Sequence, residues 1–308
     1  MCRALLYLGQ PVLLDNLLYQ PDSALVRQSF MPKMLHMLNL AGFGMRAWDP
    51  ESSDPERAYA YYSQSLPVFD RNLQNLAQKI RPTCVLAHVR GVAYSSRVEI
   101  SLQNTHPFHF RDVPLVLAHN GDLAGFADMK ARLARHVKPE YLVQIHGTTD
   151  SEWIYALFLS QLPDPAAALE RDATFEALQR TLDVIREVRA ELGISLSSSV
   201  NLFIANGHQL AAVRYCFDFG RYRTEDPAKV HEANLSFLSL WYTLGRDYGL
   251  HDGEWRMTGG AAHADSMIVA SEPLTRDTSA WVELPEYGAL FAERDPAGRP
   301  RMTVRLLD

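Results

Sequence analysis

The residue with the clearest chemical potential is Cys2, which follows the initiator residue Met1. Excision of Met1, which a small second residue favours, would leave a cysteine with both a thiol and a free α-amino group. An α-amino group has a pKa of roughly 7.7–8.0 and a thiol one of about 8.5, so the amine could act as general base to its own thiol. Because many proteins carry Cys beside Met, Cys2 is a candidate nucleophile only if other residues support it.

Further polar residues follow two strongly apolar runs. Residues 84–89 are typical of a strand covered on both faces, and they deliver His88 and Arg90 on one side, because strand residues two apart share a face. Residues 115–118 form a similar run that ends abruptly at His119-Asn120-Gly121-Asp122. Two buried strands therefore end in polar clusters.

Each polar feature also has an ordinary structural interpretation. Asn120-Gly121 is typical of a type I′ hairpin turn. Arg90 could pair with a buried carboxylate, and Asp150 could complement a helix dipole. His106 could be a core histidine in a loop. Taken one at a time, these residues leave the chemistry open.

Hydrophobic periodicity outlines the elements that must position these residues. Up to residue 192 the patterns predict strands 2–8, 42–48, 59–62, 84–89 and 114–118, and helices 15–19, 68–80, 153–162 and 166–192. A capping box is expected before the third helix, with Thr149 as N-cap and Glu152 reaching back. After Gly193 the patterns predict strands 199–205, 210–217, 235–243, 267–270, 281–284, 289–293 and 302–306, with long loops at 224–231 and 246–263.

The order of strands, then helices, then strands is unlike the regular alternation of a doubly wound fold. We therefore expect an α+β protein with two mainly antiparallel sheets and helices on the outside.

Composition narrows the class of protein. The chain has 308 residues, 47% hydrophobic and 21% charged, as in an ordinary globular protein. A net charge of -6 and the lack of a Lys/Arg run make nucleic acid an unexpected partner. There is no secretory signal pattern, and no apolar run approaches the ~18 residues of a membrane span. Three scattered cysteines without Cys-x-x-Cys spacing favour the reducing cytoplasm, with Cys84 and Cys216 as core residues.

The order of the motifs carries a resemblance. The chain resembles the class II glutamine amidotransferases, which are N-terminal nucleophile hydrolases, in Met1-Cys2, His88-Val89-Arg90, Asn104-Thr105-His106-Pro107-Phe108, His119-Asn120-Gly121 and Thr149-Asp150-Ser151-Glu152. It is similar to the single-domain branch that includes the γ-glutamyl hydrolase of ergothioneine biosynthesis and glutathione-degrading relatives in Gln28-Ser29, Gly42-Phe43-Gly44 and Ser271-Glu272-Pro273-Leu274-Thr275.

The resemblance implies a four-layer αββα sandwich and a role for each site residue. Cys2 would be the nucleophile, with its α-amino group as base, and Asn120 and Gly121 would form the oxyanion hole. Arg90 would bind the substrate α-carboxylate, Asp150 the α-ammonium group, and His106 would shape the pocket. No metal and no cofactor are expected, since the histidines lack a ligand-spaced pattern and no glycine-rich loop opens a helix.

The expected organisation is a single amidotransferase domain over residues 1–308, mature from Cys2, with no acceptor or synthase domain. Three functions stay open. The first is a γ-glutamyl amide hydrolase that acts on glutamine or a small γ-glutamyl conjugate. The second is a glutaminase subunit that delivers ammonia to a separate acceptor protein, and the third is a non-catalytic scaffold that retains the fold.

Overall fold

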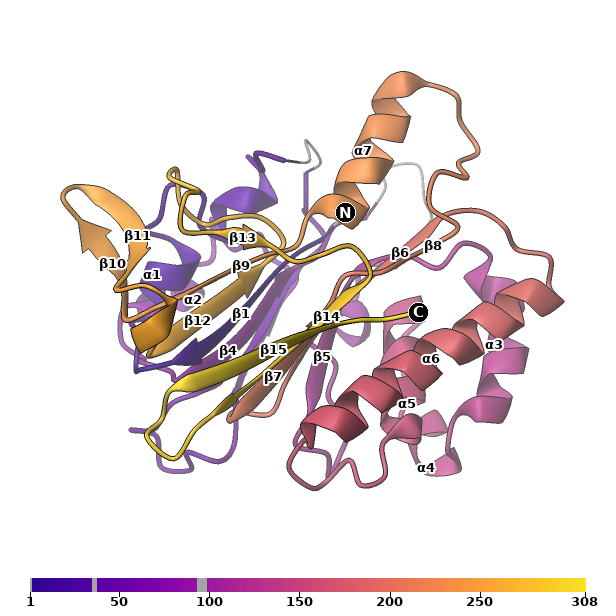
Figure 1. Cartoon of the computed structure of the whole chain (residues 1–308), viewed down its shortest axis with the longest axis horizontal. Coiled ribbons are helices and arrows are strands. Elements are labelled where there is room, and N and C mark those ends of the chain that lie inside the picture. The colour runs from indigo at the N-terminus through magenta and orange to yellow at the C-terminus, as the bar shows by residue number, and fades with distance from the viewer. Residues whose placement is uncertain (1, 35–37, 93–98) are drawn as a thin grey trace.

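Two antiparallel sheets packed face to face form the centre of the computed structural model, which describes residues 2–34, 38–92 and 99–308 (Figure 1). The first sheet has the strand order β13 (Val282–Glu283), β9 (Trp241–Gly245), β12 (Ser266–Ala270), β1 (Arg3–Gly9), β4 (Cys84–Val89), β2 (Phe43–Trp48) and β3 (Tyr59–Ser63). The second sheet has the order β15 (Pro300–Leu306), β14 (Gly288–Arg294), β7 (Gln209–Val213), β6 (Ser198–Ala205) and β5 (Val116–Gly121), and β8 (Cys216–Phe217) also pairs with β6.

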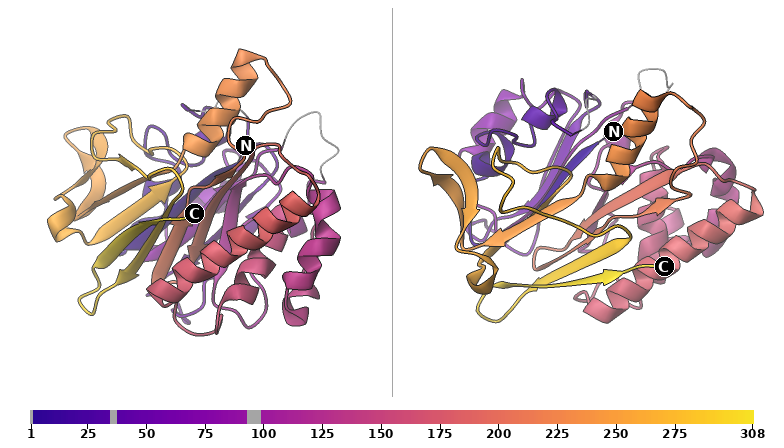
Figure 2. Two further views of the ribbon diagram at one scale, coloured as in Figure 1. Left: turned by 45° about the vertical axis from the view of Figure 1, so that its right-hand side comes forward. Right: turned by 45° about the horizontal axis from the view of Figure 1, so that its top comes forward.

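Helices cover the outer face of each sheet (Figures 1 and 2). The first sheet is covered by α1 (Asp15–Leu18) and α2 (Arg71–Ala77). The second is covered by α3 (Phe126–Leu133), α4 (Pro139–Leu142), α5 (Asp150–Gln161) and α6 (Arg171–Glu191). The helix α7 (Pro227–Leu238) projects from one end of the sandwich, and the hairpin β10 (Asp247–His251) and β11 (Glu254–Thr258) lies beside the first sheet. Short 3₁₀ turns occur at Arg27–Ser29, Leu102–Asn104, Ala134–His136 and Ala261–His263.

Between the sheets lies an apolar layer to which both contribute. Leu6 of β1 and Leu86 of β4 meet Phe203 of β6 and Leu290 of β14, all fully buried. Because side chains alternate along a strand, the neighbours of these residues face outward, as Leu5 does toward α1 and α2. The arrangement confirms the predicted four-layer αββα sandwich.

Several predicted elements have different bounds. The helix expected at 68–80 is α2, which begins at Arg71 because Asp70 accepts a hydrogen bond from Leu73 N and acts as its N-cap. The helix expected at 166–192 begins at Arg171, because Leu169 bonds through its N–H and C=O to the Gln209 side chain instead.

Three predictions in the last third of the chain are wrong in whole or in part. Residues 235–238 belong to α7, not to a strand, and the loop predicted at 224–231 contains the start of this helix, where Asp226 is the N-cap and Pro227 the first residue. The loop predicted at 246–263 contains the β10–β11 hairpin, whose Asp252-Gly253 turn has positive φ at both residues. None of the described helices is long and apolar enough to cross a membrane.

Candidate active site

Cys2 lies at one end of the layer between the sheets, immediately before β1. It shares a face with Ala4 and Leu6, so strand alternation directs its side chain into this layer. The thiol is 8% exposed, and it accepts a hydrogen bond from Gly91 N at 3.4 Å, just beyond the end of β4. Gly91 O lies 3.6 Å from the same sulfur. Met1 is outside the described residues, so its predicted excision stays a prediction.

Arg90 follows β4 on the inner face, two residues after His88, as the sequence predicts. Its side chain is 3% exposed and donates to Glu99 O at 3.0 Å. Burial lowers the pKa of the Arg90 guanidinium, while Cys2, Asp150 and Glu99 act in the opposite direction through their charges. Arg90 therefore lies within electrostatic reach of both the nucleophile candidate Cys2 and Asp150.

Asn120 and Gly121 reach the site from the second sheet. Asn120 has the same orientation as Val116 and Ala118, which face the layer between the sheets, and it is 1% exposed. The hairpin turn that Asn120-Gly121 suggests locally does not form, since both residues continue β5 and pair with Asn201 and Val200. A Cβ on Gly121 would lie 1.8 Å from Ser199 O, so only glycine fits this position.

The N–H of Gly121 points away from β6. Asp122 N donates to Ser199 O, and hydrogen-bonded and non-hydrogen-bonded pairs alternate in an antiparallel ladder, so Gly121 is a non-hydrogen-bonded position. Leu117, four residues earlier, exchanges both backbone hydrogen bonds with Phe108 along this same outer side of β5. Gly121 therefore presents a backbone donor at the free edge of the sheet.

The N-terminus of α5 holds Asp150. Thr149 Oγ1 accepts from Glu152 N at 3.4 Å, which confirms it as the N-cap. The other half of the predicted capping box is wrong, because the Glu152 carboxylate accepts from the backbone of His146 and Gly147 instead. Asp150 Oδ2 accepts from Leu123 N at 2.7 Å, which ties this carboxylate to the segment after Gly121.

Three buried histidines lie near the end of the layer that holds Cys2 and Asn120, which is called the polar end. The rings of His88 and His106 lie 4.1 Å apart, and none of their ring nitrogens has a hydrogen-bond partner among the described residues. Burial lowers the pKa of His88 to about 3 and that of His106 well below its ordinary value. His106 thus lies beside the site as a neutral packing residue, and Gly44 allows its approach, since a Cβ there would lie 2.1 Å from His106 O.

His119 faces the helices and not the layer between the sheets. Its Nδ1 lies 3.0 Å from Ser151 Oγ, and its Nε2 lies 3.3 Å from Ser199 O. Burial lowers the pKa of His119, an effect that Asp150 opposes. Ser151 Oγ in turn donates to Asp150 Oδ1 at 3.1 Å, so Ser151 links this histidine to Asp150.

Two residues of the site have no role in the sequence analysis. Ser271, which follows β12, contacts both Ala4 N and the Asn120 side chain through its hydroxyl. Glu272 forms a buried ion pair with Arg3 at 3.6 Å and accepts from the backbone of Lys33. The sequence contains a signal for both, since a polar Ser-Glu pair directly follows an apolar strand, as in the other site segments.

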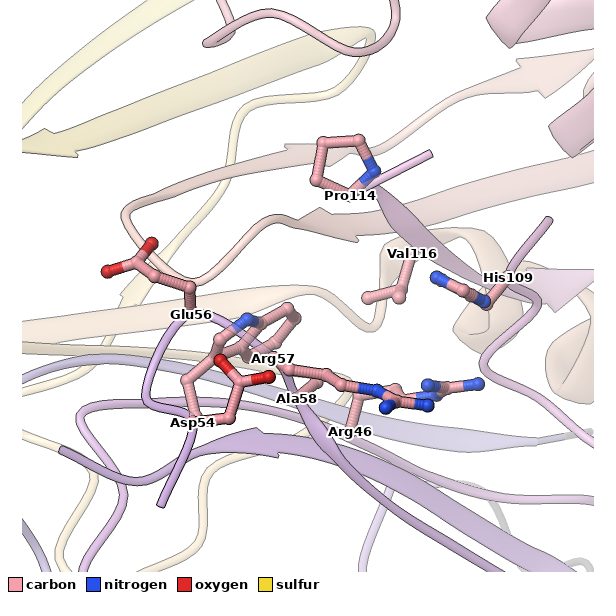
Figure 3. Close-up of a pocket in the computed structure, with 9 residues that line it drawn as sticks. Arg46, Asp54, Glu56, Arg57, Ala58, His109, Pro114 and Val116 are labelled. Atoms are coloured by element: carbon pink, nitrogen blue, oxygen red, sulfur yellow. The ribbon is translucent and has the colours of Figure 1, made fainter. Parts of the chain in front are cut away.

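One surface pocket lies apart from these residues. The pocket in Figure 3 has a volume of about 420 Å³ and is lined by Arg46, Arg57, His109 and Val116, among others. Val116 and Asn120 are four residues apart on β5, so about 13 Å of strand separates this pocket from the site. Among the described residues, no group of three or more His, Cys, Asp or Glu side chains is arranged to hold a metal ion.

The comparison with known families decides the identity of the chain. The profile described as "Glutamine amidotransferases class-II" matches residues 39–227. The chain belongs to the class II glutamine amidotransferases. The match includes every predicted site residue except Cys2, which precedes it.

Two relatives have the names of enzymes that act on amide bonds. A probable glutamine amidotransferase of Saccharomyces cerevisiae is 30% identical over 96% of this chain and 82% of its own length. The γ-glutamyl-hercynylcysteine sulfoxide hydrolase of Mycolicibacterium smegmatis is 27% identical over 70% of this chain and 79% of its own length. The chain is therefore related to a probable glutamine amidotransferase and to a hydrolase named for a γ-glutamyl substrate.

Solved structures support the fold alone. A glutamine aminotransferase class-II domain protein from Silicibacter pomeroyi covers the whole of this chain with a TM-score of 0.59 at 19% identity. The glutamine phosphoribosylpyrophosphate amidotransferase of B. subtilis superimposes with a TM-score of 0.52 at 16% identity, over 49% of its own chain. The amidotransferase thus has the fold of the N-terminal nucleophile hydrolases.

Proposed function

We propose that this amidotransferase hydrolyses the γ-glutamyl amide bond of glutamine or of a small γ-glutamyl conjugate, with Cys2 as nucleophile once Met1 has been removed. The proposal is supported by the electrostatic interaction of Arg90 with both Cys2 and Asp150, and by the Ser271 hydroxyl, which contacts both Ala4 N and Asn120. A thiol, two opposite charges and amide donors are the groups that a γ-glutamyl substrate needs.

Each end of the glutamyl group has a complementary partner. Arg90 would bind the α-carboxylate through its guanidinium, which suits bidentate recognition, and Asp150 would accept hydrogen bonds from the α-ammonium group. Because both partners are held by backbone contacts, to Glu99 O and from Leu123 N, their positions are set before substrate binds. His106 would form a neutral wall of this pocket.

Chemistry would then proceed in two stages. The Cys2 thiolate attacks the γ-carbonyl carbon, and the resulting oxyanion accepts hydrogen bonds from Asn120 Nδ2 and Gly121 N. The C–N bond breaks, the amine leaves with the proton held by the α-amino group, and a γ-glutamyl thioester remains. Water then attacks the thioester, the C–S bond breaks, and glutamate and the free thiol are released.

We infer that a single domain occupies the given sequence. The first strand of the two sheets begins at Arg3 and the last one ends at Leu306, so the amidotransferase fold includes nearly all of the given sequence. One possibility is that this domain hydrolyses the amide bond without a partner protein. Delivery of ammonia to a separate acceptor protein is the alternative, and it differs in one measurable respect, since ammonia release from glutamine would then rise when the acceptor is added.

The test is glutamate release from glutamine, glutathione, and γ-glutamyl thioether and sulfoxide conjugates. We expect activity on at least one substrate and its loss in Cys2→Ala, while Cys216→Ala, which removes a buried thiol at β8, keeps it. Intact mass establishes whether Met1 is absent. A processed protein that releases no glutamate from any substrate contradicts the proposal.

A further inference from the structure

Ser271 is a buried residue whose backbone is held from two directions. It follows β12 and is 0% exposed. Its N–H donates to Ala4 O at 3.0 Å, and its carbonyl accepts a hydrogen bond from Ser239 Oγ. Strand alternation from Val269 directs its side chain into the layer between the sheets, where Asn120 lies. The Ser271 hydroxyl therefore occupies a fixed point between the two sheets.

This hydroxyl has two neighbours of different kinds. Ala4 N lies 3.0 Å from Ser271 Oγ, and a backbone N–H can only donate, so Oγ must accept that hydrogen bond. The Asn120 side-chain amide lies 3.1 Å from the same oxygen, with Nδ2 as the near atom. In that orientation the serine accepts twice, and its own proton has no acceptor among the described residues.

The other polar atom of the Asn120 amide, its buried oxygen Oδ1, also lacks a hydrogen-bond partner among the described residues. An amide oxygen and nitrogen exchange places by a 180° rotation about the Cβ–Cγ bond, and the hydrogen-bond network decides which orientation prevails. After this rotation the Ser271 hydroxyl donates to Oδ1, so the hydroxyl proton and Oδ1 are both paired, and Nδ2 takes the position where a ligand oxygen can accept from it.

We propose that Ser271 is a positioning residue that orients the Asn120 amide for catalysis. Its oxygen accepts from Ala4 N, its proton is donated to Asn120 Oδ1, and Nδ2 consequently faces the reacting carbonyl. The inference rests on the proposed function, because it requires Asn120 Nδ2 to donate a hydrogen bond to the oxyanion. The opposite orientation would present a carbonyl oxygen to a developing negative charge, which is repulsive.

The same contacts give Ser271 a role in alignment. Ala4 belongs to β1 in the first sheet, two residues after Cys2, and Asn120 belongs to β5 in the second. One hydroxyl thus connects the strand that carries the nucleophile to the strand that carries the oxyanion donors. A threonine keeps this hydroxyl, whereas an alanine removes it with little change in volume.

A double-mutant cycle tests the proposal through kcat and KM for glutamate release. We expect Ser271→Ala to lower kcat on the order of 10-fold to 10²-fold, below the 10²–10³-fold loss expected for Asn120→Ala, with KM changed little. Ser271→Thr should restore most of kcat. In an Asn120→Ala background, Ser271→Ala should have no further effect, because its target is gone.

Two controls distinguish loss of the Asn120 orientation from displacement of the Cys2 nucleophile. Ser266→Ala removes the buried hydroxyl at the opposite end of β12, which contacts Tyr7 and Gln10, and it should leave kcat unchanged. Alkylation of Cys2 by iodoacetamide should proceed at the wild-type rate in Ser271→Ala. An equal kcat loss in both backgrounds, or an unchanged kcat, overturns the proposal.

A neutron structure of the wild-type protein provides a readout that does not depend on activity. We expect the Ser271 deuteron to point at Asn120 Oδ1 and both amide deuterons to point away from Ser271. Amide deuterons directed at Ser271 Oγ overturn the inference whatever the enzyme does. If the deuterons are as expected but Cys2→Ala and Asn120→Ala retain full activity, the proposed function fails and the orientation stands.

Discussion

The two ends of the layer between the sheets are built by the same strands but differ in character. At one end Cys2, Arg90 and Asn120 lie near buried polar atoms that have no partner among the described residues, whereas at the other Leu8 packs with Cys84 and Trp48 in a mainly apolar cluster. Strand alternation produces both, because every second residue of β1, β4 and β5 faces this layer. We infer that the apolar end raises the free energy of unfolding, whereas the polar end lowers it and in return holds the site residues in place.

The apolar end should control stability without controlling catalysis. Leu8→Ala leaves a cavity among buried side chains, and we expect the free energy of unfolding to fall by about 2–5 kcal/mol. Urea unfolding measures the loss, and kcat of the remaining folded protein should stay near the wild-type value. A large fall in kcat at matched folded fraction would break the distinction between the two ends.

Substitution at the polar end should have the reverse effect. Arg90→Gln removes the charge proposed to bind the α-carboxylate, so we expect kcat/KM to fall on the order of 10²-fold, equivalent to about 2.7 kcal/mol. Initial rates over a range of substrate concentrations measure it. Arg221→Gln, on the exposed surface beside Asp218, is the control and should be neutral. Equal kinetics for both variants would remove Arg90 from the site.

Acid should weaken the protein through its polar end. His88, His106 and His119 have pKa values lowered by burial, so below about pH 6.5 the unfolded chain binds more protons than the folded one. Stability is therefore present above that pH and is lost on acidification, by up to about 1.4 kcal/mol per pH unit for each histidine.

Urea unfolding between pH 7.5 and 5 measures this dependence. Burial raises the pKa of Asp122 to about 6, an effect of opposite sign that offsets part of the loss from the three histidines. His106→Asn should flatten the dependence, whereas His208→Gln, which removes an exposed imidazole paired with Glu56, should not. A stability that is constant over this range would contradict the assignment of three neutral histidines.

The smallest effect is expected at the start of α5. Thr149→Ala removes the N-cap contact to Glu152 N and should cost about 1 kcal/mol of stability. Because Asp150 is the first residue of this helix, KM should also rise a few-fold. Asp226→Ala removes the corresponding cap of α7 and should cost similar stability with KM unchanged, as thermal unfolding and kinetics of both variants would show.

The sequence by itself determined most of the elements and the family. Apolar runs located β1, β4 and β5, and the order of the motifs around Cys2, Arg90, Asn120 and Asp150 indicated the family that the comparisons establish. These features are local, since alternation, capping and turn chemistry act over a few residues. The Asp226-Pro227 cap and the Asp252-Gly253 turn are local signals of the same kind, although the pattern of residues 235–243 favours a strand.

Only the tertiary structure decided what each polar residue contacts. Asn120-Gly121 has a local preference for a hairpin turn, but pairing with β6 makes it part of a strand and directs the Gly121 N–H to the free edge. Ser271 meets Asn120 across 151 residues of sequence, through the packing of two sheets. Such contacts depend on which strands are neighbours and which faces oppose each other, and pairing between distant strands leaves no periodic signal in the chain.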